Sequence, residues 1–284
     1  MTQPDQDATR WNQHVDAYQR VFEPLTNAFN ARALDMLAPL GGVKLLDLAA
    51  GAGGAALAAA ALGARVTAVD ASPAMVARIA ARAASQPDGG RVEARLADAA
   101  ALPFPGASFG AALSSFGVVL LPDPGRGMAE LHRVLRPGGR VAVVTWTEPH
   151  RYEAATRLRD AVTAVRGAPP PLGDLSAQLR FTDPGRLRAL LADAGFTSVR
   201  VERVEAALHA PSAAALAASL GFAPGMAAML DALGPDREAV LLHYQTVLEA
   251  EQGMDAVALG AVAHIAVAVR PQSGQRAYHL GQGT

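Results

Sequence analysis

The sequence contains no cysteine, and this absence excludes disulfide bonds and thiolate chemistry. It is compatible with a reducing compartment. We predict no metal site from the sequence.

An excess of charge of either sign is also missing. The chain has 25 basic and 26 acidic residues, for a formal net charge of −1, and no block of Lys or Arg stands out. Nucleic-acid binding proteins leave an electrostatic footprint of clustered positive charge. We therefore predict a small-molecule partner and no nucleic acid, and the charge balance leaves the oligomeric state open, with a homodimer among the alternatives.

Long apolar runs are absent as well. The alanine-rich stretch AALAAAALGA is broken by glycine, well short of the roughly 18 apolar residues that a membrane span needs. The N-terminal MTQPDQDATRW is polar and carries acids, so it lacks the charged-then-apolar layout of a secretory signal. We expect a soluble cytoplasmic protein that does not contact a membrane.

What the sequence does contain is an alternation of short apolar runs with helical patterns. The runs that predict strands are 43–48, 65–70, 91–98, 109–116, 140–146, 198–208 and 262–270. Strands that alternate with helices form a mostly parallel sheet covered by helices on both faces. The sequence therefore predicts an α/β, doubly wound fold with a seven-stranded, mostly parallel sheet.

Helical patterns outside this alternation predict two additions to the sheet. Aromatic and apolar residues at three- and four-residue spacing, such as Trp11, Val15, Tyr18 and Phe22, predict helices near the N-terminus. A second helical stretch precedes the last strand. The predicted organisation is 1–42 as an N-terminal helical lid, 43–208 as the cofactor-binding core, 209–256 as a helical insert that caps the substrate, and 257–284 as the last strand and tail.

The stretch LLDLAAGAGG, residues 45–54, carries the first chemical signal. Ligands of open parallel sheets bind beyond the carboxyl ends of the strands. Three predicted strands end there in an acid, namely Asp47, Asp70 and Asp98. Glycines at 51 and 53 let the backbone turn tightly and approach a ligand closely. We predict a ligand site built from this glycine-rich turn and the three acids.

Two ligands compete for this pattern. Residues 51–56 satisfy the G-x-G-x-x-A dinucleotide pattern, and Asp70 lies at the distance of a ribose-binding acid. A pyrophosphate, however, would be repelled by the carboxylate of Asp47. A ligand with an ammonium and a sulfonium would gain from it, and S-adenosylmethionine can use all three acids. We therefore favour S-adenosylmethionine, with an NAD(P)-dependent oxidoreductase as the weaker alternative.

The same residues resemble a known family. LLDLAAGAGG is similar to the first motif of class I S-adenosylmethionine-dependent methyltransferases, and VTAVDASPAMVARIAARA to their second strand and helix. The block ADAAALPFPGASFGAALSSFGVVLLPDPGRGMAELHRVLRPGGRVAVVTW resembles the ubiquinone/menaquinone-methyltransferase-like (methyltransferase type 11) branch, and FTDPGRLRALLADAGFTSVRVERV resembles the segment before its sixth strand. The resemblance covers residues 43–208 and implies a Rossmann-like methyltransferase. The apolar and aromatic content of the N-terminal helices and of the insert predicts a small, hydrophobic or aromatic acceptor, and we expect a role in secondary metabolism.

The resemblance also implies roles for single residues. Asp47 and the backbone from Ala49 to Gly53, including Gly51, would hold the methionine part of the cofactor, and Asp70 would bind its ribose. The remaining residues implied to contact the cofactor are Tyr18, Ala71, Met75, Asp98, Ala99, Ser114 and Ser115. The sequence departs from the family at Gly110, where an acid is frequent, and at Gly54, where Asp or Thr is frequent. The second departure puts one polar contact to the methionine end in doubt.

The sequence leaves the methylated atom (oxygen, nitrogen or carbon) open. A general base is needed only if the acceptor must lose a proton. The base candidates are His14, His150, His209 and His243. A cofactor-binding chain repurposed for a non-methylating reaction is a further alternative, since function is decided by the site and not by the fold.

Overall fold

The computed structural model describes residues 4–170 and 177–272, so the predicted tail beyond 272 lies outside the described residues. Its centre is a seven-stranded sheet of order β3-β2-β1-β4-β5-β7-β6, in which only β7 runs antiparallel to its neighbours. The strands are β1 (Lys44–Leu48), β2 (Arg65–Asp70), β3 (Val92–Leu96), β4 (Phe109–Ser115), β5 (Leu135–Trp146), β6 (Thr197–Ala210) and β7 (Val257–Val269). The predicted doubly wound, mostly parallel sheet is confirmed.

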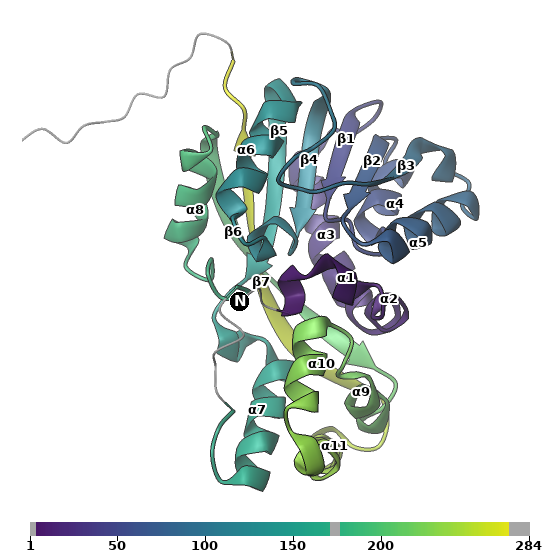
Figure 1. Ribbon diagram of the computed structural model, residues 1–284, viewed down its shortest axis with the longest axis vertical. Coiled ribbons are helices and arrows are strands. Elements are labelled where there is room, and N and C mark those ends of the chain that lie inside the picture. Colours follow the sequence, from purple (N-terminus) through teal and green to yellow (C-terminus); the bar gives the residue numbers. More distant parts are fainter. Residues whose placement is uncertain (1–3, 171–176, 273–284) are drawn as a thin grey trace, which may run out of the picture.

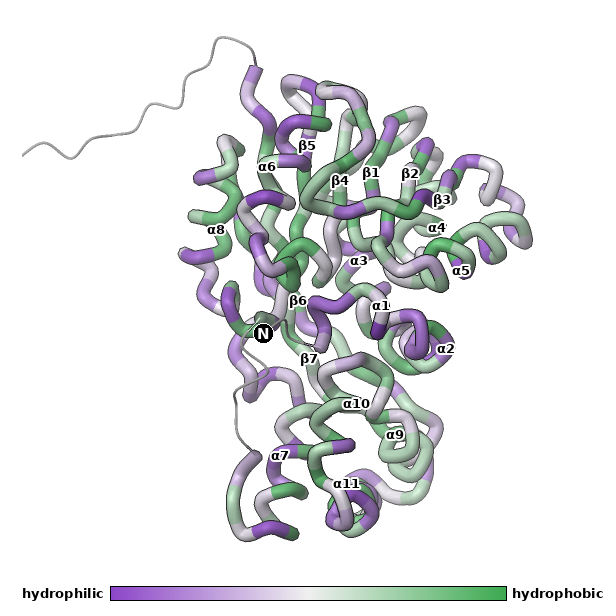
Figure 2. Tube along the Cα trace, in the orientation of Figure 1, coloured by the Kyte–Doolittle hydropathy of each residue, from purple (hydrophilic) through white to green (hydrophobic). Residues whose placement is uncertain are grey.

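Helices cover both faces of this sheet (Figure 1). One face carries α3, α4 and α5, and the other carries α6 and α8. The bounds are α3 (Glu23–Leu37), α4 (Gly54–Ala61), α5 (Pro73–Ala84), α6 (Pro124–Val134) and α8 (Pro184–Asp193). Because both faces are covered, most residues of β1, β4 and β5 are buried, although β1 carries Lys44 and Asp47 and β5 carries Arg136 and Arg140; Figure 2 shows the hydropathy along the chain.

The strand order reverses beside β1. Its register pairs Leu46 with Thr67 of β2 on one side and with Ala112 of β4 on the other. The helices that leave β1 and β4 therefore pack on opposite faces, and a crevice opens at the carboxyl ends of these two strands. This is the topological switch point where open α/β sheets bind ligands.

A second group of helices forms a lobe beyond these carboxyl ends (Figure 1). We call it the cap lobe; it comprises α7 (Glu153–Arg166), α9 (Ala213–Ser219), α10 (Pro224–Asp231) and α11 (Arg237–Gln252). The long antiparallel pair β6–β7 runs out to it and stays paired to Ala210 and Val257. Three of the four helices lie in the predicted insert 209–256.

The helix α7 departs from the predicted organisation. It lies within the segment 43–208 that the sequence assigned to the core, yet it packs against α11 in the cap lobe. Its buried residues Ala154, Leu158, Ala161 and Val162 form one apolar face that needs a partner helix. The insert 209–256 is therefore only part of the helical lobe, because α7 joins it from a different place in the chain.

The N-terminal helices lie between the cap lobe and the sheet (Figure 1). They are η1 (Pro4–Gln6), α1 (Ala8–Trp11), α2 (Val15–Ala17) and η2 (Tyr18–Phe22), followed by α3. The segment η2 is a turn of π-helix, and Pro24 sits in the first turn of α3, where a missing N–H is tolerated. We call residues 4–23, up to and including the first residue of α3, the lid, because they cover the crevice.

No single helix within residues 4–170 and 177–272 is long and apolar enough to cross a membrane. By length and composition alone, the bent pair α9 and α10 passes the same test, with an angle of 92° between the two helices. Leu216, Phe222 and Leu230 of this region are buried in the main apolar cluster of the protein.

Candidate functional site

A cavity of about 550 Å³ lies at the switch point, between the sheet, the lid and the cap lobe. One part of its wall follows the carboxyl ends of β1 and β2 and includes Ala49, Gly51 and Asp70. The opposite part is aromatic. We call this part the aromatic end; it is formed by Phe22, Phe116, Trp146, Tyr152 and Phe222.

The backbone is strained where β1 and β4 enter this cavity. Ala49 and Phe116 both adopt positive φ angles, of 58° and 57°, a region that side-chain-bearing residues rarely occupy. The two turns lie against each other, since a Cβ on Gly117 would come within 2.3 Å of the Cβ of Ala49. Backbone strain of this kind concentrates at functional sites. Ala49 and Phe116 both line the cavity.

The two predicted glycines differ in what they do. Gly51 has φ of +56°, lines the cavity, and a Cβ there would lie 3.1 Å from the ring of Tyr18. Tyr18 itself lines the cavity as well. Gly53 has φ of +91°, but a Cβ there would meet Ile79 of α5 at 3.0 Å. Gly53 does not line the cavity, so its lack of a side chain serves the packing of the turn onto α5.

Asp70 ends β2 and fixes the glycine turn. Its Oδ2 accepts a hydrogen bond from Gly51 N at 2.9 Å, and its Oδ1 accepts one from Ser72 N at 2.9 Å. Burial raises the pKa of Asp70 to about 6, against these stabilising backbone bonds. Each oxygen keeps a lone pair, and the side chain lines the cavity. The geometry suits a carboxylate that accepts ligand hydroxyls.

Asp47 lies behind the turn instead of on the cavity wall. It is 1% exposed, and its Oδ2 has no hydrogen-bond partner among the described residues. Burial, and then the negative charge of Asp70, raise the pKa of Asp47 to about 7. A buried, unpartnered carboxyl oxygen beside a second carboxylate fits a site that receives a positively charged ligand.

The other residues implied to contact the cofactor also divide into those that line the cavity and one that does not. Ala71, Met75, Asp98, Ala99 and Ser115 line the cavity. Asp98 follows β3, where its Oδ1 accepts from Ala100 N at 2.8 Å. Ser114 does not line the cavity. Its hydroxyl donates to Leu48 O at 2.9 Å and accepts from Val118 N at 2.9 Å, so it ties β4 to β1.

None of the four predicted base candidates lines the cavity. His14 binds the backbone carbonyl of Gly221 through Nδ1 at 2.9 Å and joins the lid to the cap lobe. His150 follows β5 on an exposed turn, and His209 is exposed because its neighbour Leu208 takes the buried face of β6. His243 is one position from the buried Tyr244 on α11 and so lies off its buried face. The structure therefore places none of these base candidates on the cavity wall.

Asp5 is a cavity residue that the sequence did not single out. It comes from the lid, is 7% exposed, and accepts from Gly225 N at 2.7 Å and from Gln178 Nε2 at 2.6 Å. Burial raises its pKa above the ordinary value. No pattern in the sequence marks it, because an acid in a polar N-terminal stretch looks like any solvated residue.

Glu23 at the start of α3 is a second residue that no pattern in the sequence marks. Its Oε1 accepts from Gly54 N, the first N–H of α4, at 3.0 Å, and the side chain is nearly buried. In a dinucleotide-binding turn this position at the helix N-terminus receives the pyrophosphate. Here a carboxylate of the chain itself occupies it. With Asp47 and Asp70 nearby, the crevice favours a cationic ligand and disfavours a phosphorylated one.

Within the described part of the chain, no group of three or more His, Cys, Asp or Glu side chains is placed to hold a metal ion.

Comparison with known proteins agrees with this geometry. The family described as methyltransferase domain matches residues 46–143. The chain is 32% identical over 222 residues to nocamycin O-methyltransferase of Saccharothrix syringae, covering 74% of this chain and 79% of that protein. Further relatives match over 126 residues, 45% of their own length, so the matched part spans about half of them.

Solved structures support the fold. The [4+2]-cyclase SpnF matches with a TM-score of 0.52 at 22% identity, over 87% of this chain and 81% of that one. Phosphoethanolamine N-methyltransferase 2 of Haemonchus contortus, in complex with S-adenosyl-L-methionine, matches with a TM-score of 0.54 at 18% identity, over 94% and 58%. At these identities the likeness concerns the fold alone. The family match and the long alignment show that the chain belongs to the class I S-adenosylmethionine-dependent methyltransferases. It is an enzyme of that family and uses S-adenosylmethionine as its cofactor.

Proposed function

We propose that the chain transfers the methyl group to a small, hydrophobic or aromatic molecule that binds at the aromatic end of the cavity. The single observation that carries this proposal is the ring cluster there. Phe22 stacks on Phe222 with centroids 4.8 Å apart, and Trp146 stacks on Tyr152 at 4.7 Å. These rings come from the lid, the sheet and the cap lobe, so all three parts of the molecule contribute to one apolar wall.

The ring arrangement favours flat acceptors. Phe116 and Trp146 lie 4.3 Å apart at the end of the sheet, and Phe22 contacts both of them. Aromatic walls bind planar rings by stacking and edge contacts, which are worth about 0.5–1.5 kcal/mol per pair beyond burial. Such a wall can fix the plane of an aromatic acceptor relative to the methyl donor.

The cofactor supplies a methyl group that is already activated on a sulfonium. The protein therefore needs mainly to align the acceptor and to exclude water. Alignment can lower the barrier by roughly 7–11 kcal/mol. The lid and the cap lobe enclose the aromatic end, and we propose that they act as the cover that excludes water during transfer.

We propose oxygen as the methylated atom, with Asp5 as the general base. Burial raises the pKa of Tyr152, so this hydroxyl stays neutral and cannot serve as a phenolate base. Asp5 accepts a hydrogen bond from Gly225 N, next to Met226 of the cavity wall. It therefore brings a carboxylate to the part of the cavity that the cap lobe lines. An acidic hydroxyl, such as a phenol or enol, needs only a weak base. The oxygen acceptor of the nocamycin methyltransferase, as its name gives it, also supports this proposal.

The same relative supports a role in secondary metabolism, which we propose for this chain together with a cytoplasmic location. For the residues that line the cavity, we propose the roles in cofactor binding that the sequence implies. The cofactor contacts we propose are those of Tyr18, Ala49, Gly51, Asp70, Ala71, Met75, Asp98, Ala99 and Ser115. For Asp47 we propose an indirect electrostatic role, since it does not reach the cavity wall.

A methyl-transfer screen tests the acceptor class. The purified chain would be incubated with S-adenosylmethionine labelled on the methyl group and with two matched sets of acceptors: hydroxylated aromatic or polyketide-like compounds, and small polar amines. We expect labelled products from the first set. Methylation of small polar amines alone would refute the proposal. Tight cofactor binding without transfer to any member of either set would favour a non-methylating reaction instead.

A further inference from the structure

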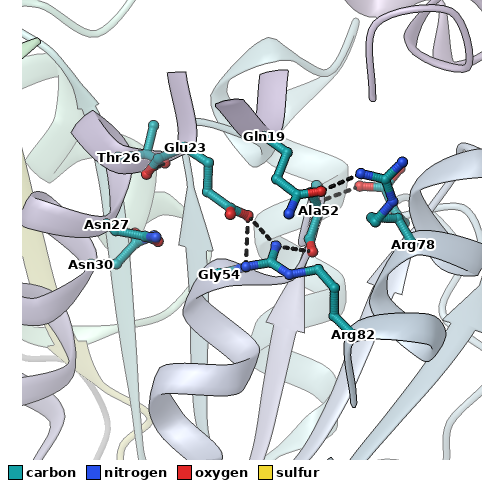
Figure 3. A network of polar contacts seen from close by, with 11 residues as sticks. Gln19, Glu23, Thr26, Asn27, Asn30, Ala52, Gly54, Arg78 and Arg82 are labelled. Atoms are coloured by element: carbon teal, nitrogen blue, oxygen red, sulfur yellow. Dashed lines mark hydrogen bonds and ion pairs between the residues drawn. The ribbon is translucent and has the colours of Figure 1, made fainter. Parts of the chain in front are cut away.

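We call residues 49–54 the glycine loop. The lid contacts this loop at two points, one on either side of Gly53. Tyr18 stands against Gly51, and Glu23 binds the N–H of Gly54. Figure 3 shows Glu23 reaching down to Gly54 and to Arg82 of α5. The loop that lines the cavity is therefore held from outside by an element that belongs to the N-terminal segment.

A turn of π-helix makes both contacts possible. In η2 the N–H of Glu23 bonds to the carbonyl of Tyr18, five residues earlier. A π-turn has more residues per turn than the 3.6 of an α-helix, so Tyr18 and Glu23, five residues apart, project closer to one side of the helix than they would in an α-helix. Both side chains consequently face the glycine loop. Isolated π-turns within helices are frequent at functional sites.

The polar contacts of Glu23 form a closed set. Its Oε1 accepts from Gly54 N at 3.0 Å and from Arg82 Nη1 at 2.8 Å, and the same Arg82 nitrogen donates to Ala52 O at 2.6 Å. Glu23 and Arg82 thus bind backbone groups on both sides of Gly53. Hydrogen bonds to charged groups are stronger than neutral ones, more so when they are buried.

The sequence of the loop requires such an external partner. Gly53 takes the N-cap position of α4 and has no side chain to cap the helix, and the next residue is again a glycine. A Cβ on Gly54 would lie 2.3 Å from Oδ1 of Asn27 and 2.9 Å from Cδ of Glu23, so the space that a side chain at 54 would take is used by the first turns of α3.

We propose that Glu23 is a positioning residue for the methyl donor: through Gly54 N and Arg82 it holds the glycine loop in the conformation that receives the methionine end of S-adenosylmethionine, so that donor binding depends on the docked lid. The coupling is reciprocal, because a loop that is fixed by the bound donor also holds Glu23 and the lid.

Glu23→Gln is the primary test. The variant keeps an oxygen for Gly54 N but loses the charge that pairs with Arg82. Binding of S-adenosylhomocysteine, measured by calorimetry, should weaken about tenfold, as expected for the loss of one charge-assisted contact. Glu23→Ala, which loses both contacts, should bind more weakly still, so that Glu23→Gln recovers part of the affinity. The melting temperature of each variant establishes that it is folded at the assay temperature.

Asp16→Asn is the matched control. Asp16 also pairs with an arginine of α5, Arg78, and Gln19 accepts from the same arginine (Figure 3 shows the Gln19 contact), and both bond to this arginine and not to the backbone of the glycine loop. This variant should leave the dissociation constant within about twofold of the parent. A purely structural role of Glu23 would lower the melting temperature of the Glu23 variants without changing their affinity for S-adenosylhomocysteine.

Hydrogen exchange gives a second readout that does not depend on activity. In the parent, S-adenosylhomocysteine should slow amide exchange in the lid as well as in residues 49–54, and in Glu23→Gln the slowing should be confined to the loop. If Glu23→Gln does not fold, Arg82→Met removes the ion pair and should weaken binding in the same direction. Unchanged affinity in folded variants, or unchanged exchange in the lid of the parent on binding, would overturn the proposal.

Discussion

Tyr18 stands directly against Gly51, so closely that a Cβ on this glycine would lie 3.1 Å from the Cε1 and from the hydroxyl oxygen of the tyrosine. The pair joins the lid to the loop at the end of β1. Tyr18 also makes an edge contact with Phe22, the first ring of the aromatic end, at 5.7 Å. One side chain therefore touches both the part of the cavity proposed for the donor and the part proposed for the acceptor.

The change Gly51→Ala should weaken binding of S-adenosylhomocysteine by about tenfold or more. The new methyl group would displace Tyr18, and the φ of +56° would cost about 1 kcal/mol for a residue with a Cβ. Calorimetry measures the affinity. Gly167→Ala is the control: this glycine also has a positive φ, of +72°, but no atom lies within 4 Å of its Cβ position. Equal loss of affinity in both variants would show that backbone strain alone is responsible.

The affinity for S-adenosylhomocysteine should rise with pH between about pH 5 and 7. In the ligand-free protein the pKa values of Asp47 and Asp70 are raised to about 7 and about 6, so both carboxyls are protonated at the lower end of this range. A ligand ammonium favours the ionised carboxylates, and binding at low pH must therefore release protons. Each proton released corresponds to up to about tenfold in affinity per pH unit.

Asp47→Asn isolates the contribution of the buried carboxyl. Since the amide cannot ionise, the variant should show a shallower pH dependence and a lower affinity at pH 7.5. Calorimetry in two buffers of different ionisation enthalpy counts the protons released. A pH dependence equal to that of the parent would assign the effect to Asp70 alone.

Asp5→Asn should lower the methyl-transfer rate at saturating S-adenosylmethionine by about 100-fold, the usual contribution of a general base. Burial raises the pKa of Asp5, so the parent rate should fall as the pH decreases through this raised value, because the base becomes protonated. The asparagine can still accept from Gly225 N. Steady-state rates across pH test this, and retention of the acidic limb in the variant would exclude Asp5 as the base.

Ser114→Ala and Ser115→Ala form a matched pair on adjacent residues. The hydroxyl of Ser114 bonds Leu48 O and Val118 N, so its loss should destabilise the fold by about 1–3 kcal/mol. Ser115 lines the cavity, and its hydroxyl has no partner among the described residues. Its removal should leave the free energy of unfolding nearly unchanged and alter the Michaelis constant of the donor or the acceptor. Denaturant unfolding together with kinetics separates the two effects.

The strand-to-acid pattern was enough to predict that Asp70 and Asp98 lie at one cavity. Asp70 and Asp98 were recognisable because parallel strands end at one edge of the sheet, and the residues that follow them must meet there. The sequence could not place the histidines relative to the cavity, for a physical reason. Whether His209 or His243 faces a cavity depends on which face of its element is buried, and that is decided by partners distant in the sequence, such as α7 against α11.

The sequence by itself determined the sheet, the helices around it and the glycine loop, because these follow from local periodicity, from the conformational freedom of Gly51 and from the acids that end the strands. Only the tertiary structure decided which groups complete the site. Asp5 and Glu23 act on Gly225 and Gly54, 220 and 31 residues away, through contacts that exist only once the lid is docked. A carboxylate becomes functional by the groups that surround it, and no local pattern in the chain records that neighbourhood.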